Sequence, residues 1–283
     1  GYQMHRLTGM GWMVTVVVGM TIQSALVKWL GETLSSVQIL WLRGAVGLFF
    51  VLPIFTFRQV RFYSHGLKRH FLRALAGVLS MACWFYALTE LPLAEATSYS
   101  FAMPLFLTVL AWAFLGEKLK WQTWLATVIG FSGVLIIMRP DSVTLGLAAL
   151  AGLAAAFLHA VAAILIKTLA SSESALALLL YFPVLAIVVF LFPAMSVWIS
   201  PTPTEWVGLV GVAALGVQTQ WGFIQACRIS DMTFLAPFDY SRLLFALVLG
   251  YLLFSELPDF WTLAGAAVVV GSTLYVVKRD HLL

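Results

Sequence analysis

A carboxylate and a guanidinium stand three residues apart inside an apolar stretch near the end of the chain. Asp239 and Arg242 fall in the stretch 232–254, and their spacing places both on one face of a helix. Ionisable groups inside a bilayer are costly, so each suggests a function. The pair either engages the charged ends of a zwitterionic small molecule or only neutralises itself, and it can do both. Pro237 removes a backbone hydrogen bond and is expected to open the helix at that depth.

Two further ionisable side chains lie inside apolar stretches. His159 is the only histidine deep in such a stretch. It either gates transport or relays protons, because imidazole ordinarily titrates near neutral pH, or it lines a wet cavity in its neutral form. Arg43 lies about two turns into the stretch 35–56. It is expected to pair with a carboxylate or to reach towards the membrane surface.

Polar and aromatic side chains gather in several of these stretches. A small-molecule site needs apolar walls with a few placed polar groups, and this mixture fits that need. The alternative is hydrogen bonding between helices and anchoring at the membrane surface. Ser98 and Tyr99 face about 100° apart on a helix, so that alternative is expected for one of the two. The candidate substrate-binding residues are Trp84, Tyr86, Ser98, Tyr99, His159, Gln218, Trp221, Phe238, Asp239 and Arg242.

The elements that position these residues are membrane helices. Hydrophobic residues make up 62% of the 283 residues, charged residues 10%, and the mean hydropathy is +0.98, which indicates an all-α integral membrane protein. Barrel strands would be half as long and would alternate in polarity. Ten transmembrane helices are expected at 10–30, 35–56, 71–89, 93–115, 121–138, 144–168, 174–197, 205–226, 232–254 and 260–277.

The chain matches itself at a constant shift of 139 residues, which places Lys28 on Lys167 without a gap. We therefore predict two repeats of five helices each, residues 1–139 and 140–283, which together form one membrane domain. Five is odd, so the second repeat must enter the bilayer from the opposite side. Inverted repeats around a central cavity are typical of secondary transporters, with the substrate site near the midplane.

Lysine and arginine orient the predicted helices. Twelve of these residues fall on the side that holds both termini, whereas Lys28 and Arg139 fall on the other side. Because positive loops stay inside, both termini are expected in the cytoplasm, as in a multi-pass protein of the bacterial inner membrane. The net charge of +4 lies in short loops beside apolar stretches and is no signal for nucleic acid.

Four charged residues shared by the two repeats suggest gates at the two mouths. Lys28 and Glu256 fall on the outer side, and Lys167 and Glu117 on the inner side, so each lysine can meet only the glutamate of the other repeat. Such contacts would bias inward-open against outward-open states. The alternative is that each glutamate stands near a helix start, where the helix dipole favours a carboxylate. Pro104 is expected to kink its helix.

Several short motifs carry a family resemblance. They are Trp41-Leu42-Arg43-Gly44, Phe85-Tyr86-Ala87-Leu88, Pro92-Leu93-Ala94-Glu95-Ala96, Met103-Pro104-Leu105, Phe114-Leu115-Gly116-Glu117 and Phe254-Ser255-Glu256. This ordered set resembles the drug/metabolite transporter superfamily, in its ten-helix EamA-type branch. The resemblance implies export or exchange of small metabolites through a central cavity by alternating access, with amino acids as the favoured solutes and another small metabolite as the alternative. General similarity favours YddG-type exporters of aromatic amino acids.

No enzyme, cofactor or metal signature accompanies these motifs. The sequence has no His-Glu-x-x-His, no Gly-x-Ser-x-Gly, no nucleotide-binding loop and no Cys/His ligand spacing. We therefore expect no enzyme activity, no cofactor and no metal. The expected partners are a small-molecule substrate and the lipid bilayer, without nucleic acid or an obligate protein partner. A channel-like facilitator remains the alternative, because fold alone does not determine mechanism.

Overall fold

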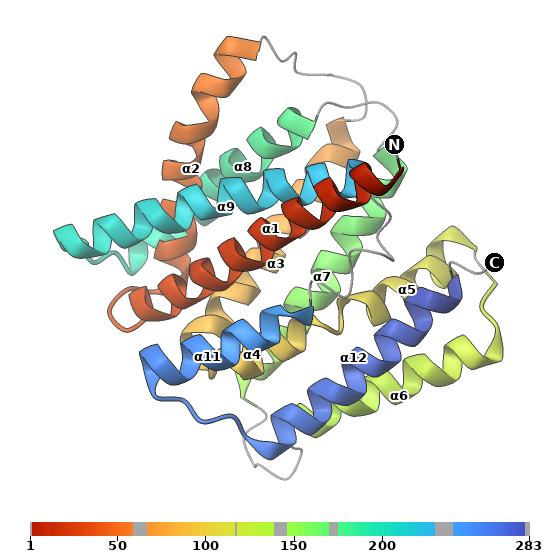
Figure 1. Cartoon of the computed structure of the whole chain (residues 1–283). Helices are drawn as coiled ribbons and strands as arrows, with labels where there is room; N and C mark the ends of the chain where they lie inside the picture. Colours follow the sequence, from red (N-terminus) through yellow and green to blue (C-terminus); the bar gives the residue numbers. More distant parts are fainter. Residues whose placement is uncertain are drawn as a thin grey trace.

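The chain folds into a bundle of long apolar helices (Figure 1). The computed structural model describes residues 2–58, 67–116, 118–138, 146–169, 175–229 and 240–280. Helices suit a chain in lipid, because each one satisfies its backbone hydrogen bonds within its own segment. The helices are α1 (Tyr2–Leu30), α2 (Ser36–Arg58), α3 (Leu67–Glu90), α4 (Leu93–Ser100), α5 (Met103–Leu115), α6 (Trp121–Met138), α7 (Leu147–Leu169), α8 (Ala175–Ser196), α9 (Pro203–Ile229), α11 (Arg242–Phe254) and α12 (Phe260–Asp280).

Several of these helices have the length and apolar character of membrane spans. Six stretches in the described ranges are long and apolar enough to cross a bilayer: Leu7–Leu30, Ser36–Pro53, Phe71–Glu90, Leu93–Phe114, Leu147–Leu165 and Leu179–Ser196. Shorter apolar helices lie at Trp121–Ile137, Arg242–Phe254 and Phe260–Tyr275. The regular structure in the described ranges is all helical, which confirms the predicted all-α class there.

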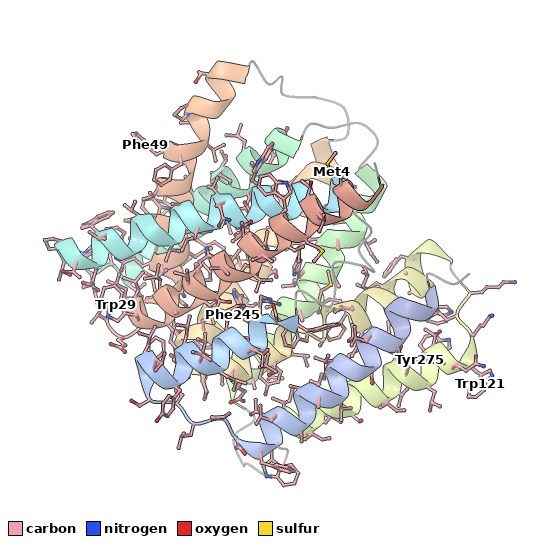
Figure 2. The ribbon with its side chains drawn as sticks, in the orientation of Figure 1. Met4, Trp29, Phe49, Trp121, Phe245 and Tyr275 are labelled. Carbon is pink, nitrogen blue, oxygen red and sulfur yellow. The ribbon has the colours of Figure 1, made fainter. Side chains whose placement is uncertain are left out.

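The outer surface of the bundle is apolar. Figure 2 shows Phe49 and Trp121 at its edges, where their side chains are 75% and 70% exposed. Phe114 and Phe192 are exposed to a similar degree, at 76% and 84%. So much bare aromatic surface is unfavourable in water and is explained by contact with lipid.

The closest helix pairs join the two halves of the chain. α1 lies along α9, α3 along α7, α2 along α8 and α6 along α12. Figure 1 shows α1 beside α9 and α6 beside α12. Each pair takes one helix from each half, so the halves interlock instead of forming separate domains.

Glycines allow the closest of these approaches. A Cβ atom on Gly265 of α12 would lie 2.6 Å from the carbonyl oxygen of Gly133 on α6. Between α1 and α9, a Cβ atom on Gly19 would lie 2.5 Å from Oε1 of Gln218. Lipid gives helices little hydrophobic reason to associate, so close packing of small residues replaces that driving force.

The stretch 93–115, predicted as one helix, is divided into α4 and α5. Phe101 and Ala102 form the turn between them, with N–H groups that bond three residues back at 3.2 and 3.1 Å. Pro104 lies in the first turn of α5, where the missing N–H costs little. In an unbroken helix, residue 104 would donate its N–H to the carbonyl of Ser100, but proline has no N–H to donate. The helix is therefore broken before Pro104, where only a kink was expected.

Candidate functional site

A narrow hollow between α1, α4 and α11 is the candidate substrate site. Its walls are Met20, Thr21 and Ser24 of α1, Leu93 and Thr97 of α4, and Arg242 and Ala246 of α11. α1 and α4 belong to the first half of the chain and α11 to the second. The central hollow, as we call it, therefore lies where the two halves meet.

Among the described residues that line the central hollow, Arg242 is the charged one. This first residue of α11 is 7% exposed. Its Nη2 donates a hydrogen bond to Oγ of Ser100 at 3.0 Å, and its guanidinium carbon lies 5.3 Å from the centroid of the Phe101 ring. Both contacts come from the end of α4, so that end positions the cation. A guanidinium held in this way suits a carboxylate or phosphate group.

Three hydroxyl groups complete the polar part of the central hollow. Each donates its hydrogen to a carbonyl of its own helix: Thr21 to Val17 at 2.7 Å, Ser24 to Met20 at 2.8 Å and Thr97 to Leu93 at 2.8 Å. With their protons engaged, the three oxygen atoms can act only as acceptors towards a ligand. The hollow thus offers a cationic donor on one side and neutral acceptors on the others.

Lys28 and Glu256 form an ion pair at the other end of α4. Nζ of Lys28 lies 2.9 Å from Oε1 of Glu256 and donates to the carbonyl of Leu91 at 2.7 Å. The N–H of Leu93 donates to Oε2 of Glu256 at 2.8 Å. We call Lys28, Glu256 and the backbone of Leu91 and Leu93 the latch. The contact expected between Lys28 and Glu256 is thus present.

The carboxylate of Glu256 caps a helix in a distant part of the chain. α4 begins after Pro92, which has no capping side chain, and the first N–H of the helix would otherwise lack a partner. Glu256 supplies that partner and places negative charge at the positive end of the helix. The helix that follows Glu256 in the chain, α12, has a capping residue of its own, because Asp259 accepts the backbone N–H of Trp261 at 3.1 Å.

A second hollow of about 230 Å³ opens beside the latch. Ala246 lines both hollows, so the wall between them is one residue thick at that point. Its volume is below the about 300 Å³ of the smallest usual ligand pockets, and the central hollow has no room even for a water molecule, so neither is open for a ligand in this structure. We interpret the larger hollow as an approach to the closed central one. Its walls are Pro92, Ala94, Glu95, Ala246, Leu247, Gly250, Glu256, Leu257, Pro258, Asp259 and Thr262.

Ser98 and Tyr99 are wholly buried and line neither hollow. The hydroxyl of Ser98 donates to the carbonyl of Ala94 at 2.7 Å. The Tyr99 ring packs on Gly152 of α7, where an added Cβ would lie 3.0 Å from the ring. Ser98 therefore bonds within α4, whereas Tyr99 packs α4 against α7.

Other candidate residues also lie between helices or on the surface. Nε2 of Gln218 donates to the carbonyl of Thr15 at 3.3 Å, which ties α9 to α1. Trp221 packs beside the buried Val51. The side chain of His159 is exposed on α7. These three residues, and the partly buried Trp84 and Tyr86, are absent from the walls of both hollows.

Five candidates cannot be placed. Glu117, Pro237, Phe238 and Asp239 lie outside the described residues, and Lys167 belongs to α7 without a described side chain. The pairing of Asp239 with Arg242 and the second gate contact therefore stay predictions.

The hydroxyls of α1 were missed in the sequence. Thr21 and Ser24 line the central hollow, and Gln23 between them donates to the carbonyl of Val212 at 3.1 Å. The signal was present, because these residues form a polar island in an otherwise apolar helix. In the middle of a membrane helix such an island marks the face that meets other helices or a cavity.

Comparison with known proteins identifies a family of transporters. The profile of the EamA-like transporter family matches residues 7–139 and again residues 146–278. An S-adenosylmethionine uptake transporter of Rickettsia felis is 31% identical over 97% of this chain and 94% of its own length. A riboflavin transporter of Vibrio cholerae is 27% identical over 98% of this chain and 95% of its own. The pseudopaline exporter CntI of Pseudomonas aeruginosa is 27% identical over 88% and 89%.

The solutes in these names do not support one expectation. None of the three relatives is named for an aromatic amino acid or for amino-acid export. The similarity to exporters of aromatic amino acids rested on no diagnostic residue, and it finds no support here.

Proposed function

The chain belongs to the EamA-like transporter family of the drug/metabolite transporter superfamily, and from this membership we propose that it is a secondary transporter that moves a small metabolite by alternating access. The observation that carries the proposal is Arg242, a buried cation in the wall of a hollow between the two halves of the chain. Intramembrane cations beside a cavity are typical of substrate pathways.

The proposed architecture is ten membrane helices in two inverted repeats around the central cavity. α4 and α5 count together as the fourth helix, and the segment that ends in α11 counts as the ninth. The two ranges matched by the family profile start at 7 and 146 and end at 139 and 278, so both shifts equal 139. This agreement with the shift in the sequence supports a duplicated unit.

Packing supports a two-fold relation between the repeats. At the shift of 139 residues, α1 corresponds to α7, α3 to α9, α2 to α8 and α6 to α12. Exchange of the two repeats therefore converts the pair α1–α9 into the pair α7–α3, and each of the pairs α2–α8 and α6–α12 into itself. These four pairs are the most closely packed among the described helices. A two-fold axis also brings a residue against its own counterpart. Phe101 and Tyr240, 139 positions apart, have ring centroids 5.1 Å apart.

The proposed orientation follows the charges in the loops. Positive residues gather on the side of the termini, which favours a cytoplasmic position for both termini and an outer position for Lys28. In this orientation the latch closes the outer mouth, and a contact between Lys167 and Glu117 would close the inner one. Each contact would stabilise the state in which its mouth is shut.

The proposed substrate is a small metabolite with a carboxylate or another anionic group. That group would bind the guanidinium of Arg242, and donors on the same molecule would meet the hydroxyl oxygens of Thr21, Ser24 and Thr97. Asp239 remains a candidate for a positive group of the substrate. S-adenosylmethionine, the solute named for one relative, carries a carboxylate and is the first to test, and riboflavin, named for another relative, is the comparison without an anionic group.

Counterflow in liposomes tests the function. The purified chain is reconstituted, and uptake of each labelled solute is measured against an excess of the same solute inside, for S-adenosylmethionine, riboflavin, amino acids, nucleosides and sugars. We expect saturable counterflow for at least one solute with an anionic group. Flux that is proportional to the gradient and never saturates would indicate a channel, and no counterflow of any anionic solute would contradict the substrate class.

Two arginine variants test the site with a matched control. Arg242→Gln is expected to raise the half-saturating concentration about 10- to 100-fold, because it removes a charge-assisted hydrogen bond. Arg43→Gln removes an equally buried arginine that lines neither hollow and is expected to leave that concentration unchanged. Equal losses in the two variants would show that Arg242 has no special place in binding.

A further inference from the structure

α4 is held at both ends by the segment that contains α11. At its start, the N–H of Leu93 donates to Glu256, which follows the last residue of α11 by two positions. At its end, Oγ of Ser100 accepts from Arg242, which is the first residue of α11. α4 has eight residues, and its two ends are about 12 Å apart. We call Leu93, Ser100, Arg242 and Glu256 the clamp.

The clamp and the latch share one carboxylate. Oε2 of Glu256 accepts the N–H of Leu93, while Oε1 of the same group pairs with Lys28 of α1. α1 supplies the remaining wall of the central hollow, through Met20, Thr21 and Ser24. A movement of α4 that pulls Leu93 from the carboxylate therefore also changes the contact that holds α1 to the α11 segment.

An anion in the central hollow would compete with the other end of α4. The guanidinium of Arg242 gives a hydrogen bond to Ser100 and rests on Phe101, at the last turn of α4. A carboxylate or phosphate accepts more strongly than a serine hydroxyl, so it would draw the guanidinium away from Ser100. The end of α4 is then released while its start is still held.

We infer that α4 couples Arg242 to the latch, and that Ser100, at the end of α4 that contacts Arg242, is the positioning residue of this coupling. Release of Ser100 lets α4 shift, Leu93 leaves Glu256, and the pair of Glu256 with Lys28 weakens. By linkage, opening of the latch in turn frees Arg242 for an anion. The identity of the anion rests on the proposed function, whereas the mechanical coupling does not.

Accessibility of one cysteine tests the coupling without any substrate. Cys83→Ala and Cys227→Ala remove the native thiols, and Ala246→Cys places a reporter between the two hollows, where the native side chain is 2% exposed. The rate of modification by a membrane-impermeant thiol reagent is measured from each side of the membrane. Glu256→Gln is expected to raise the rate from the latch side about tenfold, because the ion pair is lost.

Ser100→Ala is the decisive variant. It is expected to raise the rate from the latch side severalfold although it lies at the far end of α4, and Ser100→Thr, which keeps the hydroxyl, is expected to restore the slow rate. The double variant Ser100→Ala, Glu256→Gln is expected to react no faster than Glu256→Gln alone, because both changes act by weakening the same ion pair of Glu256 with Lys28. Phe101→Leu removes the ring beneath the guanidinium and tests the same end if Ser100→Ala does not fold.

Ser80→Ala is the control, because it removes a serine hydrogen bond between two other helices, from Oγ to the carbonyl of Ala155 at 2.8 Å. Its rate is expected to equal that of the background. The inference is overturned if Ser100→Ala behaves like Ser80→Ala, or if Glu256→Gln leaves the rate unchanged. Coupling without transport of any anion would overturn the proposed function and leave the coupling intact.

Discussion

The guanidinium of Arg43 lies on the ring of Phe182, with 4.5 Å between the guanidinium carbon and the ring centroid. The two residues stand 139 positions apart, so they occupy matching places in the two halves of the chain. One half has a cation where the other has an aromatic ring, and they meet where α2 packs on α8. Two arginines would repel each other at this point, whereas an arginine and a ring attract.

Replacement of Arg43 by methionine is expected to leave the protein at least as stable. Arg43 is 3% exposed, and its Nε and Nη2 have no hydrogen-bond partner in the part of the chain that the structure describes. A buried cation without such partners is costly, and its contact with the ring offsets only about 0.5–2 kcal/mol. Arg43→Lys is expected to lower the Tm, since a compact ammonium loses more hydration. Thermal unfolding in detergent checks both variants; a larger loss for methionine than for lysine would contradict the argument.

Gly216 makes room for this guanidinium. A Cβ atom on Gly216 would lie 2.6 Å from Nη2 and 2.8 Å from Nε of Arg43. We expect Gly216→Ala to displace Arg43 from Phe182 and to lower the free energy of unfolding by about 1–3 kcal/mol. The same change in an Arg43→Ala background should cost much less, which a double-mutant cycle measures. An equal cost in both backgrounds would mean that Gly216 serves some other contact.

The latch carboxylate has two separable roles. Glu256→Gln keeps an acceptor for the N–H of Leu93 but loses the ion pair with Lys28, whereas Glu256→Ala loses both contacts. We therefore expect the Tm to fall in the order wild type, Gln, Ala, with a total cost of about 1–3 kcal/mol for alanine. A glutamine variant as unstable as alanine would show that the charge, and not the cap, matters.

The gate predicts a difference between the two mouths. The double variant Lys28→Ala, Glu256→Ala removes the latch but none of the residues of the inner contact. Thiol reagents are therefore expected to reach reporter cysteines faster from the latch side and at an unchanged rate from the other side. Unchanged rates at both mouths would rule out a gate at this ion pair.

The helices and the latch contact could be predicted because the bilayer leaves few alternatives. A stretch of about 20 apolar residues has to cross as a helix, so most predicted helices match described ones in position, although 93–115 is divided and 232–254 is described only from residue 240. The pair Lys28 and Glu256 followed from counting crossings, since opposite charges on one side of the membrane can meet. Its second partner, the N–H of Leu93, depends on a turn that the sequence does not show.

The central hollow could be predicted only in part. Arg242 stood out because a charge in lipid is rare, but a neutral polar residue such as Gln218 can serve either a ligand or a neighbouring backbone carbonyl. Which of the two it serves depends on the rotation of its helix, and contacts distant in the sequence set that rotation. Tyr99 shows the effect, because its ring meets Gly152 and is covered there.

Alanine substitutions at three glycines of α6 and α12 can distinguish the steric cost of an added Cβ atom from the gain in stability that alanine gives a helix backbone. A Cβ on Gly265 would lie 2.6 Å from the carbonyl of Gly133, and a backbone carbonyl cannot yield unless the helices separate, so Gly265→Ala is expected to cost about 1–3 kcal/mol. A Cβ on Gly130 would meet the end of the Leu105 side chain at 2.5 Å, which can rotate aside where a backbone carbonyl cannot, so Gly130→Ala should cost less. Gly271 has no atom within 4 Å of such a Cβ, and Gly271→Ala is expected to stabilise α12 by about 0.5–1 kcal/mol. The Tm values of the three variants check this order; a loss at Gly271 as large as at Gly265 would show that the close approach of α6 and α12 is not what limits these positions.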